Sequence, residues 1–183
     1  MTRLKKTIRN LLIIAVLLLL FMKLNGLYFT PEQALHASER DLHYGPSEIV
    51  HSFDYDNSRF FLTKYEGFIS CSPIERALGV FWRYGAGYGT ENQNDRQLYF
   101  NYRSGETVWY LYGIRNDPVI SSVKIELQNQ NGTEKTLGTD VFYEDMFYVI
   151  WEGESEDSMG SGLASMYITA YDDTGAVVYE TAY

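Results

Sequence analysis

A run of twelve apolar residues near the N-terminus constrains this chain more than any other feature. Residues 11–22 carry only aliphatic, phenylalanine and methionine side chains, and they follow a basic stretch with the cations Arg3, Lys5, Lys6 and Arg9. A helix that is apolar all round does not match the one-sided apolar stripe of a helix on the surface of a soluble domain. We therefore expect this segment to lie in a membrane.

The length of the apolar segment leaves two interpretations open. Residues 11–22 make about 18 Å of helix, which is short for roughly 30 Å of hydrocarbon and typical of a cleaved signal sequence. Residues 11–29 make about 28 Å, with Lys23 able to snorkel and aromatic residues at the end suited to the interface. Gly26 is the only small residue where cleavage would occur. We therefore favour an uncleaved transmembrane signal anchor at residues 11–29, with a cleaved signal as the alternative.

The charge is distributed very unevenly along the chain. Residues 1–26 hold five cations and no acid, a net +5, so residues 27–183 hold ten cations and twenty-four acids, a net −14. The positive-inside rule predicts a cytoplasmic basic tail at residues 1–10 and an extracytoplasmic C-terminal domain. The expected location is thus the cell membrane, with a single pass. The acidic domain should repel nucleic acid, which we exclude as a partner.

A helix and then many strands are expected after the membrane segment. Thr30, Pro31 and Gln33 make a capping box with proline at the first helical position, which predicts a helix from there to His43. Gly45 and the following proline end it. Residues 74–83 fit a helix or a strand, and the glycine within them favours a strand. Period-two patterns predict strands at residues 49–55, 59–65, 67–71, 74–83, 97–103, 107–114, 123–128, 145–152, 165–171 and 176–183.

The predicted fold class is mainly β (α+β), with an N-terminal membrane helix, one amphipathic helix, antiparallel sheets and a C-terminal β-sandwich-like portion. We place a boundary at Pro118, between a helix-plus-sheet region at 30–117 and the sandwich-like region at 118–183. The strand spacing of about ten residues in the second region is the rhythm of an immunoglobulin-type sandwich. The cysteine–tryptophan–cysteine framework of such domains is absent from the sequence.

Residues 30–46, with the sequence TPEQALHASERDLHYGP, resemble the start of the outer domain of a group of bacterial proteins. These are small, uncharacterised single-pass membrane-anchored envelope proteins of Gram-positive bacteria. The resemblance covers these seventeen residues, implies the same location, and brings no known activity.

The densest cluster of aromatic residues supplies the candidate binding site. Alternation along the predicted strands at 97–103 and 107–114 places aromatic side chains on both faces of the sheet. Either a second layer covers the extra face, or that face is an exposed ligand platform. We take Tyr99 and Trp109 as the candidate ligand-binding residues, with an envelope protein or a glycan as the partner. The aromatic residues of the cluster are Phe81, Trp82, Tyr84, Tyr88, Tyr99, Phe100, Tyr102, Trp109, Tyr110 and Tyr112.

Two other functions are kept as alternatives. Asp54 and Asp56 flank one residue and could act as paired carboxylates in an extracytoplasmic hydrolase. The acidic stretch at residues 152–158 could bind calcium in a calcium-stabilised structural module, although its spacing is not that of a known calcium loop. A membrane-anchored binding or interaction module is the favoured function.

The remaining residues that could carry chemistry are expected to be structural. His36, Glu39 and His43 project from one helix face, but Arg40 occupies the position where a second zinc ligand would stand. The glycine-rich stretch at residues 85–89 is followed by acidic, loop-like sequence and is expected to be a connection. The single Cys71 cannot form an internal disulfide and should be a small buried apolar residue. We expect no metal and no cofactor.

Overall fold

A computed structural model describes residues 3–85, 89–104, 108–129, 134–152 and 163–182. The protein is mainly β with antiparallel sheets and two helices within these ranges, as the sequence predicts. The chain forms two compact units. Unit 1 contains Met1–Tyr65 and Cys71–Tyr88, and unit 2 contains Glu66–Ser70 and Gly89–Tyr183.

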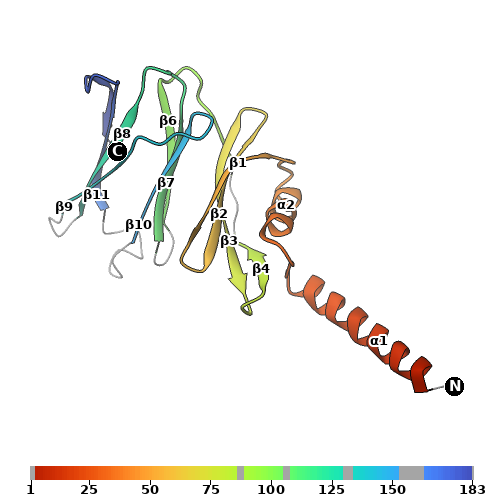
Figure 1. Cartoon of the computed structure of the whole chain (residues 1–183). Helices are drawn as coiled ribbons and strands as arrows, with labels where there is room; N and C mark the ends of the chain where they lie inside the picture. The colour runs from red at the N-terminus through yellow and green to blue at the C-terminus, as the bar shows by residue number, and fades with distance from the viewer. Residues whose placement is uncertain (1–2, 86–88, 105–107, 130–133, 153–162, 183) are drawn as a thin grey trace. The chain divides into compact units, whose positions relative to one another are not determined.

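Helix α1 (Arg3–Leu24) is long and apolar enough to cross a membrane (Figure 1). Its 22 residues make about 33 Å of helix, and Met22 is its only buried residue. We expected residues 11–29 to span the membrane. The helix instead begins at Arg3, eight residues before that segment begins, and ends at Leu24, five residues before that segment ends. It stops because Gly26 adopts a positive φ of 61° and the N–H of Leu27 turns back to the carbonyl of Met22.

Helix α2 (Pro31–Asp41) begins where the capping box predicts. The Thr30 hydroxyl accepts a hydrogen bond from the Gln33 N–H at 3.2 Å, and the Gln33 side chain accepts one from the Phe29 N–H at 3.3 Å. The helix ends at Asp41, two residues before the predicted end. Asp41 also accepts a hydrogen bond from the hydroxyl of Tyr84, which ties the end of α2 to the sheet of unit 1.

The sheet that α2 packs on has the strand order β1-β2-β3-β4. Its small core joins Ala34 and Leu35 of the helix to Phe61 and Ile74 of the sheet. The strands are β1 (Glu48–Tyr55), β2 (Ser58–Tyr65), β3 (Phe68–Ala77) and β4 (Phe81–Tyr84), and the short β5 (Gly89–Glu91) of unit 2 pairs with residues 68–70.

Residues 74–83 form a hairpin, which differs from the single strand that we expected. Strand β3 runs to Ala77, the chain reverses, and β4 begins at Phe81 with Ile74 opposite Tyr84. The reversal requires positive φ values at Leu78 (52°) and Gly79 (76°). The apolar alternation continues through this turn, so it conceals the break.

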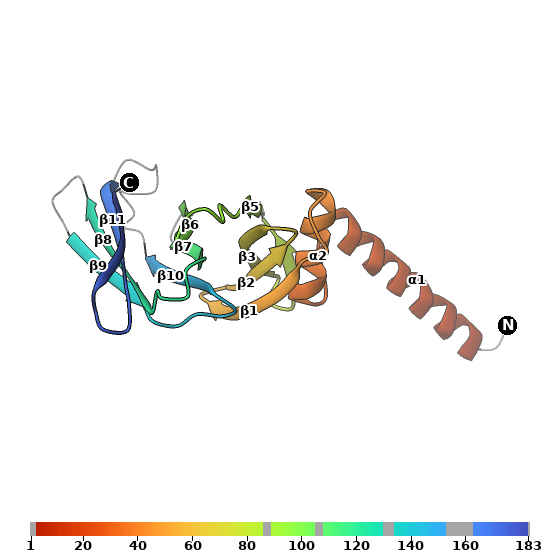
Figure 2. The same ribbon diagram turned by 90° about the horizontal axis from the view of Figure 1, so that it is seen from above.

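Unit 2 contains a sandwich of two antiparallel sheets (Figure 2). One sheet has the order β10-β7-β6 and the other β12-β11-β8-β9, and a single core lies between them around Leu111, Ile125 and Ile168. This three-on-four arrangement is the architecture of immunoglobulin-type sandwiches. The strands are β6 (Leu98–Ser104), β7 (Val108–Arg115), β8 (Ser122–Asn129), β9 (Glu134–Thr139), β10 (Met146–Glu152), β11 (Leu163–Tyr171) and β12 (Val177–Ala182).

The sandwich begins at β6, so it includes more of the chain than the predicted region at 118–183. Pro118 lies between β7 and β8, within unit 2. Strand β7 pairs with β10, for example Leu111 with Val149, across more than thirty residues of sequence. Local periodicity does not reveal a pairing at that separation.

Candidate functional site

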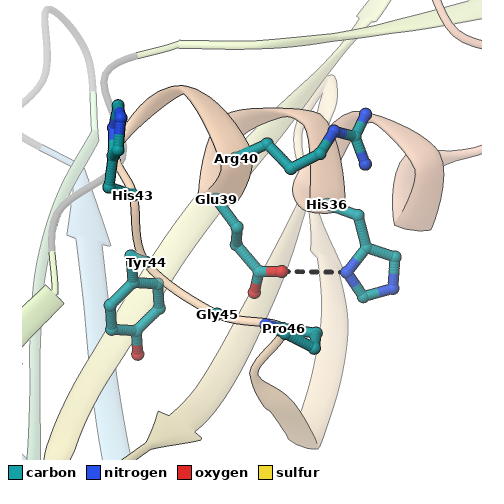
Figure 3. A pocket seen from close by; sticks show the side chains of 7 residues that line it. All are labelled: His36, Glu39, Arg40, His43, Tyr44, Gly45 and Pro46. Carbon is teal, nitrogen blue, oxygen red and sulfur yellow. Dashed lines mark hydrogen bonds and ion pairs between the residues drawn. The ribbon is translucent and has the colours of Figure 1, made fainter.

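A pocket of about 400 Å³ lies in unit 1, where α2 ends and the chain turns back along the helix. Figure 3 shows the Glu39 carboxylate between His36 and the Gly45–Pro46 segment. The volume lies within the range typical of small-molecule sites. The pocket is lined by His36, Glu39, Arg40, His43, Tyr44, Gly45 and Pro46.

The pocket exists because α2 ends in a Schellman motif. The N–H of Tyr44 donates to the carbonyl of Glu39 at 2.9 Å, and the N–H of His43 donates to the carbonyl of Arg40 at 3.3 Å. His43 has the left-handed conformation, with a φ of 55°, at the position where glycine is usual. The chain therefore folds back, and Gly45 comes to lie against the helix face that carries Glu39.

Glu39 is the buried charge of this site, with 4% of its surface exposed. Its Oε2 accepts a hydrogen bond from His36 Nδ1 at 2.9 Å, and its Oε1 accepts one from the Ser47 hydroxyl. A buried carboxylate is costly unless donors satisfy it, and these two donors do so. Gly45 has a φ of 98°, and a Cβ there would lie 2.9 Å from Glu39 Oε2. Glycine is thus required at position 45 for two reasons.

The wall of the pocket is mainly apolar, and a few side chains add polar donors to it. Because Nδ1 of His36 is held by Glu39, Nε2 is the ring nitrogen that faces away from the carboxylate (Figure 3). Arg40 and His43 are exposed and line the same pocket. A guanidinium and two imidazoles are donors that suit hydroxyl, carboxylate or phosphate oxygens. Within the described ranges there is no cluster of three or more His, Cys, Asp or Glu side chains that could hold a metal ion.

The two predicted ligand residues, Tyr99 and Trp109, lie on opposite faces of their sheet. Tyr99 is opposite Ile114 and Trp109 opposite Ser104, so the alternation of the strands separates them. Trp109 is 4% exposed and packs in the sandwich core, with its ring 6.3 Å from that of Trp151. The face that carries Trp109 is covered by a second layer, which was the other interpretation of this sheet. A platform containing both residues is therefore not formed.

The aspartates of the hydrolase alternative are on the surface of unit 1. Asp54 and Asp56 are both exposed, and Arg59 binds Asp54 through two hydrogen bonds of 2.7 and 2.9 Å. This interaction lowers the pKa of Asp54. A general acid needs a raised pKa, so the geometry does not favour the hydrolase.

The other candidates are placed as follows. Cys71 is buried, as predicted, and burial raises the pKa of its thiol, which makes the thiolate scarce. Most of the predicted calcium loop at 152–158 and of the glycine-rich stretch at 85–89 lies outside the described residues.

The sequence places His36, Glu39 and His43 on one helix face, but it gives no sign of the pocket. The missing partners were Gly45 and Ser47, which belong to the segment that turns back. The Gly45–Pro46 pair after the helix is visible in the sequence, but there it predicts only where the helix ends. The direction in which the chain turned was decided by His43, whose left-handed conformation is rare for a residue other than glycine.

No protein-family model, curated protein or solved structure matches this chain.

Proposed function

We propose that the chain is a single-pass, membrane-anchored binding module of the cell envelope, with its β-rich units outside the membrane. The observation that supports this most is the state of α1, an apolar helix whose residues are exposed except for Met22. Such a surface is stable in lipid and unfavourable in water.

The anchor continues directly into folded structure, which supports a retained helix. Leu27 is 8% exposed, and Tyr28 exchanges two backbone hydrogen bonds with Trp82 at 2.8 and 2.9 Å. Three residues separate Leu24, the last of the helix, from this pair. Unit 1 is thereby held next to the anchor, as a module that must act at the membrane surface would be.

The orientation follows from the charges at the two ends of α1. Four cations precede the apolar segment, and Lys23 alone follows it closely. The positive-inside rule keeps the N-terminus in the cytoplasm and places the net −14 of residues 27–183 outside.

The Glu39 pocket is the binding site in this proposal. The pocket offers hydrogen-bond donors from Arg40, His36 and His43, although residues 27–183 as a whole are acidic. These donors match hydroxyl-rich or acidic groups. Envelope glycans and acidic protein side chains both carry such groups. We propose an envelope glycan or protein as the partner.

The location is tested by fractionation and protease protection of the full-length chain with an N-terminal epitope tag. We expect the chain to be in the membrane fraction and to resist extraction by alkaline carbonate. We also expect the N-terminal epitope to be protected when protease is added to intact spheroplasts. Recovery of the full-length chain in the soluble cytosolic fraction would contradict the proposal.

Binding is tested by placing a photoreactive amino acid at His43, on the pocket, and at Asp173 as the control. Asp173 is exposed in the β11–β12 turn and does not line the pocket. We expect a crosslinked product in intact cells from position 43 alone. Equal products, or none, from both positions would reject the pocket as the binding site.

A further inference from the structure

We propose that the tip of the β3–β4 hairpin is a second membrane contact, which inserts Leu78 and Val80 into the lipid surface beside the anchor helix. This inference rests on the proposed function, because it requires α1 to be in the membrane. It adds a surface of unit 1 that binds lipid directly.

The tip exposes apolar surface that packing does not use. Leu78 is 72% exposed and Val80 is 70% exposed. They are the two most exposed large apolar side chains outside α1 in the described part of the chain. Exposed apolar side chains that lie together mark a surface that is covered by something else.

The backbone at the tip makes leucine an unfavourable choice for folding. Leu78 has a φ of 52°, a left-handed conformation in which glycine, asparagine or aspartate is less strained. The other residues apart from glycine with positive φ in the described ranges are all polar or charged: His43, Asp56, Glu66, Glu144 and Asp145. Leucine at this turn is explained by contact of its side chain with lipid.

The hairpin is joined to the end of the anchor helix. Trp82 pairs with Tyr28 through two backbone hydrogen bonds, and the rings of Phe29 and Phe81 lie 5.7 Å apart. Val80 lies in the turn, two residues before Trp82 in the sequence. Figure 1 shows the hairpin beside the end of α1. The four aromatic residues form the kind of belt that sits at the interface of a membrane.

The position of the anchor points to lipid as the occupant. Helix α1 is long and apolar enough to cross a membrane, and it ends at Leu24. Four residues further on, Tyr28 pairs with Trp82 of the hairpin. The hairpin is therefore joined to the chain where the chain leaves the outer face of the bilayer, which brings its apolar tip close to lipid.

The charge of the hairpin fits the same occupant. Residues 74–84 hold Arg76, Arg83 and Glu75, a net +1, although residues 27–183 together hold −14. The Arg76 guanidinium lies 4.9 Å from the ring centre of Trp82, and Arg83 pairs with Glu75 at 3.3 Å. Arginines beside interfacial aromatic residues are attracted to anionic headgroups.

The experiment measures how deeply the hairpin tip lies in lipid. The full-length chain is reconstituted in nanodiscs of phosphatidylethanolamine and phosphatidylglycerol, and an environment-sensitive fluorophore is attached to single introduced thiols. The variants are Leu78→Cys and Val80→Cys at the tip, Leu17→Cys in α1, and Asp173→Cys as the aqueous control. The native Cys71 is 4% exposed and stays unlabelled in the folded protein. Lipids with nitroxide groups on their acyl chains then quench the fluorophores that reach them.

We expect blue-shifted emission and quenching at positions 78, 80 and 17, and neither at 173. Val80→Glu, with the label kept at 78, should abolish the quenching at 78 while leaving it at 17. If positions 78 and 80 are as solvated as 173 while 17 is quenched, the hairpin proposal is overturned and the anchor stands. If 17 is also solvated, the proposed function fails with it. Protection of 78 in native membranes but not in nanodiscs would overturn lipid in favour of a protein partner.

Discussion

Replacing Gly45 with alanine should destabilise unit 1, because of the backbone conformation at position 45 and the close contact with Glu39. Holding alanine at a φ of 98° destabilises the folded state by about 1–2 kcal/mol. Alanine also lowers the conformational entropy of the unfolded chain, which offsets about 0.4–1 kcal/mol of that free energy. The added Cβ would lie 2.9 Å from Glu39 Oε2 and 3.0 Å from the backbone nitrogen of Ser47. Glu39 is buried and held by two hydrogen bonds, so it cannot move away at little cost. Crowding of this kind adds about 1–3 kcal/mol, so the total lies between about 1 and 5 kcal/mol, with a midpoint near 3 kcal/mol.

Gly79→Ala is the matched control, since it lies in the same unit and isolates the effect of the backbone. Gly79 has a φ of 76°, and a Cβ there would meet nothing within 4 Å. The control should therefore lose about 1 kcal/mol or less. The difference between the two variants measures the contact with Glu39.

The assay is amide hydrogen exchange of α2, followed by mass spectrometry on the full-length chain in detergent micelles. A loss of about 3 kcal/mol, the midpoint of this range, should speed exchange of the protected α2 amides by about 150-fold in Gly45→Ala. The control should change by less than about tenfold. If Gly45→Ala exchanges no faster than Gly79→Ala, Gly45 does not close the pocket against Glu39.

Three further predictions concern the rest of the molecule. Gly113→Ala should destabilise unit 2 by about 3 kcal/mol or more in a urea titration, because its Cβ would lie 2.3 Å from the backbone oxygen of Tyr99; wild-type stability would contradict the β6–β7 register. Cys71 should react with a maleimide only after denaturant is added, and rapid labelling of the native protein would show that it is not buried. The Arg59 hydrogen bond lowers the pKa of Asp54, so its small stabilisation is present above pH 3.8 and is lost as pH falls through the lower folded-state pKa. Asp54→Asn should flatten that acid decline in thermal melts, and an unchanged decline would contradict the pairing.

Much of the secondary structure was predictable because it depends on neighbouring residues. The capping box at Thr30 located the start of α2, and the alternation of Val123, Ile125 and Leu127 located β8 with its buried face. The hairpin at 74–83 was missed, because apolar residues on both sides of a turn look like one continuous strand. The turn depends on the left-handed conformation of Leu78, which that residue type gives no reason to expect.

The candidate site was predictable only in part. His36 and Glu39 were visible as neighbours on one helix face, since a spacing of three suffices to bring them together. The burial of Glu39 depends on Ser47, eight residues away and beyond a chain reversal. The aromatic platform failed for a related reason, since local alternation assigns faces within a strand but does not say which face another sheet covers.

The sequence by itself determined the apolar N-terminal helix, the acidic charge of the remainder, the mainly β class and the start of α2, because composition and short-range periodicity are properties of the unfolded chain. The tertiary structure alone decided that β7 pairs with β10, that Trp109 belongs to a core, that Glu39 is buried in a pocket, and that Trp82 of the β3–β4 hairpin pairs with Tyr28. Each of these features depends on contacts between residues that are distant in sequence. Such contacts form only when the whole unit packs together.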